Sequence, residues 1–266
     1  MPKLSDVIEV IETLAPPRLA DDWDNSGLQV GDAGAEVKSV LVALDPVPDV
    51  MAEAASLGAG LVVAHHPLFF GTVKSLELGR GTGAVVNAAI KNGIAIYSAH
   101  TSFDRAKTGV SDALADALML KGTKPLTAVA GFPGCGYGRV GKLPAKQSIG
   151  DIAKRLKTAL GAGTVRLTGD PKKKVGTVAV CGGSGSSLME DALSAGAELY
   201  VTGDIKYHDA LKALELGLSV LDVGHFASEL AAVPLMAGLL TKAFTKKGWK
   251  IKVDISKAQG EPWSYL

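Results

Sequence analysis

The sequence predicts an α/β protein of two similar lobes, each built on a mostly parallel sheet. Three observations support this fold class. Short apolar runs typical of strands alternate with helical runs, a segment of the first half is repeated in the second, and each half ends a strand with a histidine four residues before a carboxylate. Strands that alternate with helices form parallel sheets with helices packed on the sheet faces.

Six runs are short, apolar and rich in Val, Ile or Leu, as buried strands are. They are residues 37–45, 61–66, 93–100, 175–181, 199–203 and 218–223. Six segments between or after them have helical character, namely residues 47–57, 83–91, 110–120, 188–195, 207–216 and 230–244. Both halves therefore follow the order strand, helix, strand, which predicts βαβ units.

Residues 39–66 align with residues 177–204 without a gap. The match includes the pattern Ala-x-Ser-x-Gly-Ala-x-Leu-x-Val at 54–63 and again at 192–201. Two unrelated βαβ units could share a packing solution, but the glycine and serine matches favour an internal duplication. We therefore expect lobes at residues 1–125 and 126–266, joined where the Gly/Pro-rich residues 132–138 resist regular structure.

The composition excludes several classes of protein. The 266 residues hold 28 basic and 27 acidic side chains, so a strong electrostatic attraction to nucleic acid or anionic lipid is not expected. No run approaches the ~20 uninterrupted apolar residues of a membrane helix, and the first residues lack the apolar region of a signal peptide. Two cysteines argue against a disulfide scaffold. These features predict a cytoplasmic protein without membrane or nucleic-acid partners.

The adjacent His65 and His66 are the first candidates for metal ligands, because imidazole is the commonest protein ligand of transition metals. They end a strand-like run and precede Pro67. Neighbouring strand residues point to opposite faces, but the proline ends regular pairing and lets the chain bend, so both rings can turn into one cavity. Alternatively, one ring binds metal and the other forms a supporting hydrogen bond.

Two further pairs, His100 with Asp104 and His225 with Glu229, share the spacing His-x-x-x-carboxylate. On a helix this spacing puts both side chains on one face, where they can chelate one ion; Asp104 could instead stand in a loop. Three or four imidazoles with two carboxylates suit two metal ions about 3.5–4 Å apart, expected in the crevice between the lobes. Nitrogen and oxygen ligands without thiolate indicate Zn, Fe, Mn, Co or Ni.

Two other segments contain candidate substrate contacts. Gly183 and Ser184 lie in a Gly/Ser-rich turn at 181–187, which either binds phosphate through backbone N–H groups or is only a tight strand-to-helix turn. Trp23 and Asn25 lie in Asp-Asp-Trp-Asp-Asn-Ser-Gly at 21–27. Trp23 either stacks on a substrate ring or fills the core.

In the second half, Gly203 and Asp204 occupy the positions that correspond to His65 and His66, and Lys206 and His208 follow shortly after them. Lys206 is a candidate substrate contact, and Asp204 and His208 are candidate catalytic groups for proton transfer. Asp204 could equally cap the helix that it precedes.

Five segments resemble the Nif-three-like family, whose members are labelled GTP cyclohydrolase I type 2 homologues. These are Trp-Asp-Asn-Ser-Gly-Leu-Gln (23–29), Ala-His-His-Pro-Leu (64–68), Ser-Ala-His-Thr-Ser-Phe-Asp (98–104), Thr-Gly-Asp (202–204) and Gly-His-Phe-Ala-Ser-Glu (224–229). The resemblance covers nearly the whole chain. It implies two α/β lobes around a dinuclear metal centre, in a ring-like homohexamer.

The resemblance also implies roles for individual residues. It assigns the metal-ligand role to His65, His66, Asp104, His225 and Glu229. His100 then lies outside the ligands, as an acid/base or orienting group. Some relatives carry an additional domain between the lobes, for which the short connection at 121–137 leaves no room.

The function implied by the resemblance is that of a metal-dependent hydrolase that opens the guanine ring of GTP and releases formate. His100 or His208 would transfer protons, and Lys206 with the 182–187 loop would contact the triphosphate. Nothing local selects guanine, so hydrolysis of another nucleotide or a phosphoester stays open. The same ligands would serve a non-enzymatic metal-binding, metal-delivery or scaffold protein. DNA encirclement by a ring is disfavoured by the near-zero net charge.

Overall fold

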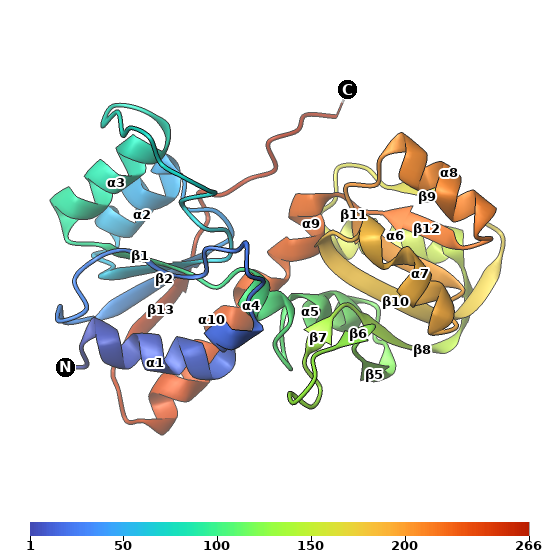
Figure 1. Cartoon of the computed structure of the whole chain (residues 1–266), viewed down its shortest axis with the longest axis horizontal. Coiled ribbons are helices and arrows are strands. Elements are labelled where there is room, and N and C mark those ends of the chain that lie inside the picture. The colour runs from blue at the N-terminus through green and yellow to red at the C-terminus, as the bar shows by residue number, and fades with distance from the viewer. Residues whose placement is uncertain (266) are drawn as a thin grey trace. The chain divides into compact units, whose positions relative to one another are not determined.

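Both βαβ units expected from the sequence are present in the computed structural model, which describes residues 1–265 (Figure 1). The first consists of β2 (Ser39–Ala43), α2 (Pro48–Ser56) and β3 (Leu61–Ala64), and the second of β10 (Lys174–Ser184), α7 (Met189–Ser194) and β11 (Leu199–Gly203). The strands pair in parallel with the same register: Val40 lies opposite Leu61, and Val178 lies opposite Leu199. The ungapped alignment superposes these same positions, so the sequence repeat is also a structural repeat.

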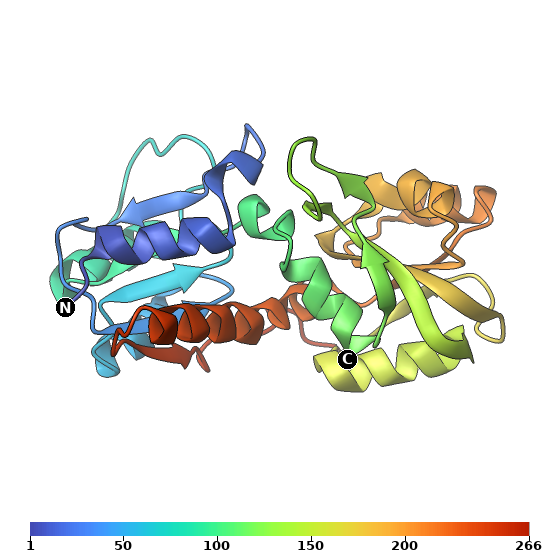
Figure 2. The same ribbon diagram turned by 90° about the horizontal axis from the view of Figure 1, so that it is seen from below.

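The first compact unit comprises residues 1–106 and 233–260. Its sheet has the order β1-β4-β3-β2-β13, and all strands run parallel to one another except β1, which pairs antiparallel with β4. The elements not yet named are α1 (Leu4–Leu14), β1 (Gly27–Val30), α3 (Gly81–Asn92), β4 (Ala95–Ser98), α4 (Thr101–Asp104), α10 (Ala232–Lys246) and β13 (Lys252–Ile255), with a 3-10 turn at Pro17–Leu19. Leu41, Val62 and Ile96 face α2 and α3, while α1 and α10 cover the opposite face of the sheet (Figures 1 and 2).

Residues His225–Lys246, which form α9 (His225–Leu230) and α10, are long and apolar enough to cross a membrane by length and composition, with a mean hydropathy of 1.2. However, 44% of the apolar window in this stretch is buried inside the protein. Met236, Leu240 and Phe244 of α10 are all buried. This burial is typical of a helix in a protein core.

The second unit comprises residues 107–232 with the chain from Glu261 on. Its sheet has the order β5-β8-β10-β11-β12-β9, and only β10, β11 and β12 run parallel to each other. The remaining elements are α5 (Val110–Ala117), β5 (Lys121–Lys124), β8 (Arg139–Ser148), α6 (Ile149–Leu160), β9 (Arg166–Thr168), a 3-10 turn (Ser186–Leu188), α8 (Tyr207–Glu215) and β12 (Ser219–Asp222). This sheet is mixed, whereas that of the first unit is mostly parallel as expected. The antiparallel strands escaped prediction because they are short or carry many charged residues.

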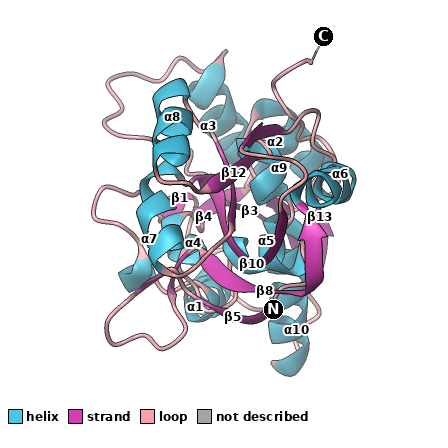
Figure 3. Ribbon diagram, turned by 90° about the vertical axis from the view of Figure 1, so that its right-hand side faces the viewer, coloured by secondary structure: helices cyan, strands magenta, loops and turns pink. Residues whose placement is uncertain are grey.

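Helices cover both faces of this second sheet, as Figure 3 shows. Val178, Val180 and Leu221 point to the face covered by α5, α6 and α9. Ala179 and Val220 point to the opposite face, toward α7 and α8. The alternation of neighbouring strand residues between the two cores follows from the period of two in a strand.

The division of the chain differs from the expected boundary near residue 125. The units separate between Ala106 and Lys107, because α5 packs Leu114 and Ala115 into the core of the second unit. The C-terminal part returns to the first unit, where β13 pairs in parallel with β2. The segment expected to resist regular structure also takes part in a small ladder, in which β7 (Gly136–Tyr137) pairs with β6 (Thr127–Ala128).

Candidate metal-ligand sets

Three histidines of the first unit lie together at the carboxyl ends of neighbouring parallel strands. His65 and His66 follow β3, and His100 follows β4. The ring centroids are 5.0 Å apart for His65 and His66, 5.2 Å for His65 and His100, and 5.5 Å for His66 and His100. One ligand nitrogen from each ring lies within 4.8 Å of the other two. This arrangement can hold a metal ion.

Each of these imidazoles donates a hydrogen bond from Nδ1 to an oxygen atom. The acceptors are the Ala99 carbonyl for His65 at 3.0 Å, the Asp45 carboxylate for His66 at 2.8 Å, and the Asp24 carboxylate for His100 at 2.8 Å. Because these oxygens only accept, Nδ1 carries a proton in each ring. Metal-binding histidines are commonly held in this way, with one nitrogen on a carboxylate or carbonyl and the other on the metal.

Asp24, which is not among the residues predicted from the sequence, organises the surroundings of His100. Its buried carboxylate also accepts hydrogen bonds from the hydroxyls of Ser26 and Thr101, both at 2.6 Å. Burial acts to raise the pKa of Asp24, but the hydrogen bonds from His100, Ser26 and Thr101 outweigh it and hold this pKa well below its ordinary value. Asp24 is therefore an anion that fixes the His100 ring. The sequence signal that could have pointed to Asp24 is its position between Trp23 and Asn25, two residues already considered as substrate contacts.

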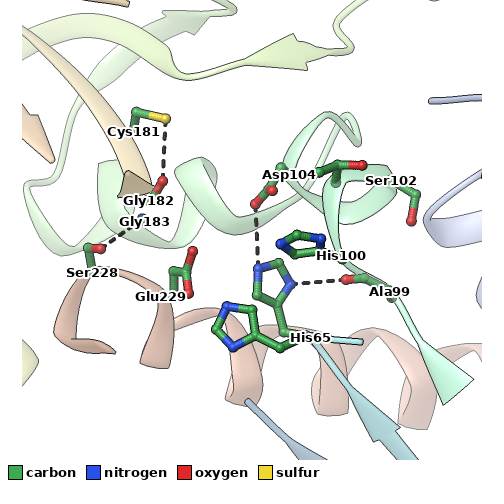
Figure 4. A network of polar contacts seen from close by, with 12 residues as sticks. His65, Ala99, His100, Ser102, Asp104, Cys181, Gly182, Gly183, Ser228 and Glu229 are labelled. Carbon is green, nitrogen blue, oxygen red and sulfur yellow. Dashed lines mark hydrogen bonds and ion pairs between the residues drawn. The ribbon is translucent and has the colours of Figure 1, made fainter. Parts of the chain in front are cut away.

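Asp104 belongs to the same unit and faces His65. Its Oδ1 lies 3.7 Å from Nε2 of His65 (Figure 4). The backbone N–H of Asp104 donates to the His100 carbonyl at 3.0 Å, so this residue ends the one-turn helix α4 and does not stand in a loop. The spacing His-x-x-x-Asp thus corresponds to one helical turn here as well.

The second unit contains the pair His225 and Glu229. Helix α9 begins at His225, and Nε2 of His225 lies 3.0 Å from Oε2 of Glu229 one turn later. Glu229 is buried. Nδ1 of His225 donates to Oδ2 of Asp204 at 2.8 Å. The predicted placement of both side chains on one helix face is therefore correct.

The charges around His225 favour a cation at this position. The hydrogen bond with Glu229 is the largest cause that raises the pKa of His225 to about 9; burial opposes the rise, and the charges of Glu229 and Asp204 add to it. In the metal-free chain, the His225 ring therefore stays protonated at neutral pH, between the carboxylates of Glu229 and Asp204. A divalent cation bound to Nε2 and Glu229 would replace this proton.

Asp204 orients His225 and does not cap the following helix. The N-terminal N–H of α8, on Lys206, is instead paired with Oδ2 of Asp209 at 3.1 Å. Asp204 has a φ of +55°, a left-handed conformation that costs energy for most residues and that aspartate tolerates better than most. The strained residue and its bond to His225 indicate that this end of β11 is shaped for the site.

Gly183, in the Gly/Ser-rich turn, forms hydrogen bonds within the protein through both of its backbone groups. The N–H of Gly183 donates to Oγ of Ser228 at 2.9 Å (Figure 4), and its carbonyl accepts from Thr202 at 3.1 Å. A Cβ on Gly183 would lie 2.2 Å from Oε1 of Glu229. Gly183 therefore makes room for the Glu229 carboxylate, and its N–H is bonded within the protein, which favours the tight-turn alternative; the phosphate contact stays a prediction. Ser184 is exposed at the end of β10.

Two exposed aromatic rings flank His100. Trp23 is 66% exposed, which excludes core filling, and its ring centroid lies 5.8 Å from that of His100. Phe70, which is also not among the residues predicted from the sequence, is 65% exposed, and its ring centroid lies at the same distance from that of His100. Nδ2 of Asn25 donates to the Phe69 carbonyl at 3.0 Å, so Asn25 ties the two aromatic segments together.

Lys206 and His208 lie on the exposed surface at the start of α8. The His208 ring contacts that of Tyr207, with the centroids 5.2 Å apart. Within residues 1–265, the His, Cys, Asp and Glu side chains grouped closely enough to hold a metal ion do not include His208. Lys206 borders a separate cavity.

Comparisons with known proteins agree with this architecture. Residues 2–262 match the family model Duf34/NIF3 (NGG1p interacting factor 3). A Streptomyces coelicolor protein named GTP cyclohydrolase 1 type 2 homolog is 39% identical over 269 residues, covering 99% of this chain and 94% of the relative. A Clostridium perfringens protein of the same name is 34% identical, over 99% of this chain and all of the relative.

Solved structures share the fold over the full length. A Bacillus cereus protein related to NIF3 superposes with a TM-score of 0.93 at 26% identity, over 100% of this chain and 99% of the other. A hypothetical protein from Staphylococcus aureus gives a TM-score of 0.94 at 28% identity, over 99% of both chains. The resemblance stated from the sequence is thus confirmed, and the chain belongs to the Duf34/NIF3 (NGG1p interacting factor 3) family.

Proposed function

We propose that this protein binds divalent metal ions and is a metal-dependent hydrolase of nucleotides. The observation that carries the proposal is the arrangement of His65 and His66, in which an oxygen atom holds Nδ1 of each ring, as in metal-binding histidines, and the ring centroids lie 5.0 Å apart. Relatives named GTP cyclohydrolase 1 type 2 homolog point to GTP as the substrate, with opening of the guanine ring and release of formate.

The ligand assignment follows the two sets. His65, His66 and Asp104 bind metal in the first unit, and His225 and Glu229 bind metal in the second, for a total of two ions per chain. Donors of nitrogen and oxygen fit Zn, Fe, Mn, Co or Ni. Bound ions of this kind supply a water molecule of lowered pKa and an electrophile that polarises the substrate.

The protein's own residues hold the substrate and move protons. His100, fixed by the ionised Asp24, is a candidate general acid or base at Nε2. Asp204 keeps the proton of His225 on Nδ1 and so directs Nε2 toward the metal. Trp23 offers an exposed ring beside His100, on which a planar base can stack.

The test combines metal analysis with turnover. Metal content is measured on the purified chain, and formate release from GTP and hydrolysis of a nucleotide panel are measured with each candidate metal. We expect His65→Ala and Glu229→Ala to lose metal and activity together. His208→Ala, outside both ligand sets, is expected to keep its metal and shows whether the sequence-predicted proton transfer is needed. A fully metallated protein that turns over no nucleotide would reject the hydrolase.

The donor count in the first unit favours a second candidate, a metal-binding or metal-delivery protein without catalysis. Three imidazoles together with Asp104 provide four donors, enough to saturate a tetrahedral ion and leave no position for water. Catalysis requires an open position. Spectroscopy of the Co²⁺-loaded protein separates the two candidates, since added azide changes the spectrum only where a coordination position is open.

We also propose that the chain assembles as a homohexamer in the cytoplasm, as the family resemblance implies. Measurement of the molecular mass in solution tests the assembly. A mass of one chain at micromolar concentration would contradict it.

A further inference from the structure

A cavity of about 300 Å³ lies in the second unit, apart from the metal-ligand sets. It is bounded by the antiparallel pair of β9 and β12 and by the start of α8. The residues that matter for its chemistry are Arg166, Leu167, Ile205, Lys206, Tyr207 and Val220. Its position at the carboxyl end of a parallel strand pair is where α/β sheets usually bind ligands.

Two cationic side chains line this cavity. The guanidinium of Arg166 uses Nη2 for its hydrogen bonds to the Ile205 carbonyl, at 2.9 Å, and to the carboxylate of Asp222. A guanidinium has five N–H donors, so Nε and Nη1 can still bind an oxyanion. Lys206, at the start of α8, forms no ion pair with any residue in the described part of the chain. The unused N–H donors of Arg166, which is paired with Asp222, and the ammonium group of Lys206 are therefore available to a bound anion.

The cavity wall is held in place before any ligand arrives. Asp222 is buried, and besides Arg166 it accepts the N–H of Gly224 at 2.8 Å and the N–H of Ile205 at 3.0 Å. Since these contacts fix the carboxylate, they also fix the guanidinium that pairs with it. A pre-organised cation binds an anion with less loss of entropy than a flexible one.

Besides Thr168 and Asp222, the remaining lining of the cavity is largely apolar. Leu167, Ile205 and Val220 contribute aliphatic side chains, and Tyr207, 73% exposed, adds an aromatic ring. A bare inorganic ion would leave this surface unused. A cavity that combines convergent polar groups with an apolar lining is typical of a small-molecule site.

We propose that this cavity binds a small organic oxyanion, a phosphate monoester or a carboxylate on a compact apolar body. Arg166 and Lys206 bind the oxyanion, and Leu167, Val220 and Tyr207 contact the body. The proposal concerns ligand binding alone and does not depend on the hydrolase activity or on the metal ions.

The test is calorimetric titration of the full-length chain with phenyl phosphate, benzoate and inorganic phosphate, and with phenol as the uncharged control. We expect phenyl phosphate or benzoate to bind at least tenfold more tightly than phenol and inorganic phosphate. Comparison of the first two identifies which oxyanion the site prefers. Lys206→Gln should weaken binding about tenfold, because a charge-assisted hydrogen bond is lost.

The matched control is Lys157→Gln, which removes the same charge from an exposed lysine of α6 outside the cavity lining. It should bind within twofold of the unchanged protein. Arg166→Lys, a second variant, keeps the charge paired with Asp222 but loses the forked donors, and should weaken binding severalfold. The proposal is overturned if Lys206→Gln binds as tightly as Lys157→Gln, or if binding is lost in Glu229→Ala but kept in Lys206→Gln. Absence of binding by all organic anions also overturns it.

Discussion

Gly183 is expected to control the position of Glu229, and its replacement by alanine tests the metal-ligand role of that carboxylate. A Cβ at this position would lie 2.2 Å from Oε1 of Glu229 and 3.5 Å from Cε1 of His225. Carbon–oxygen approaches below 3.0 Å are essentially never seen for a Cβ, so the carboxylate must retreat by about 0.8 Å. Gly183→Ala should therefore disturb the 3.0 Å contact between Glu229 and His225.

The expected effect of Gly183→Ala has two parts, a loss of stability and a loss of metal affinity, and a matched control variant separates them. Gly183 has a φ of +65°, where an alanine costs about 1–2 kcal/mol of stability. Gly217 has a φ of +67° with nothing within 4 Å of a built Cβ, so Gly217→Ala carries the backbone cost without the collision. Displacement of a ligand or of its support typically weakens metal binding 10- to 100-fold. We expect this loss in Gly183→Ala alone.

The assay is a competition titration with Zn²⁺ and a chromophoric chelator, with urea unfolding of both variants alongside. Both variants should lose similar stability in the metal-free form, and only Gly183→Ala should lose affinity for the metal. If the two variants bind Zn²⁺ within twofold of each other, Glu229 is not a metal ligand or its position does not depend on Gly183. Either result would refute the reasoning.

Three further predictions concern the ligand sets. Asp24→Asn removes the anionic acceptor of Nδ1 of His100. It should lower the metal affinity of the first set about 10-fold if His100 supports the metal, or lower the activity if His100 is the acid/base group. Co²⁺ titration measures the first effect, and pH–rate profiles measure the second. In the metal-free protein, the raised pKa of His225 gives stability that is fully present below pH 6.5 and lost as the pH rises through about 9. The expected loss of stability is on the order of 1 kcal/mol, because the His225 side chain is 37% exposed and its charge is screened by solvent. Urea unfolding at pH 6, 7.5 and 9 should show this loss for the unchanged chain and not for His225→Gln. Removal of metal by a chelator should lower the melting temperature. The lost stabilisation is about 2.7 kcal/mol if the free-metal concentration was 100-fold above Kd. In differential scanning fluorimetry, His65→Ala should show a smaller shift than the unchanged chain.

Much of the fold was predictable because its signals are local. The strand at Leu199–Gly203 was predicted to the residue, and the repeat of residues 39–66 at 177–204 corresponds to a shared strand register. The charged strands β5 and β8 carried no such signal, because their partners in the sheet, and not their own hydrophobicity, make them strands. For the same reason the return of β13 to the first sheet could not be foreseen.

The candidate site divides in the same way. The sequence by itself determined the positions of the imidazoles at strand ends and the one-turn spacing of His225 and Glu229, since strand and helix periods are properties of neighbouring residues. Only the tertiary structure decided which oxygen holds each Nδ1. Asp24 is separated from His100 by 76 residues, and Asp45 from His66 by 21. Hydrogen-bond partners at such distances are selected by packing of the whole sheet, which no local pattern encodes.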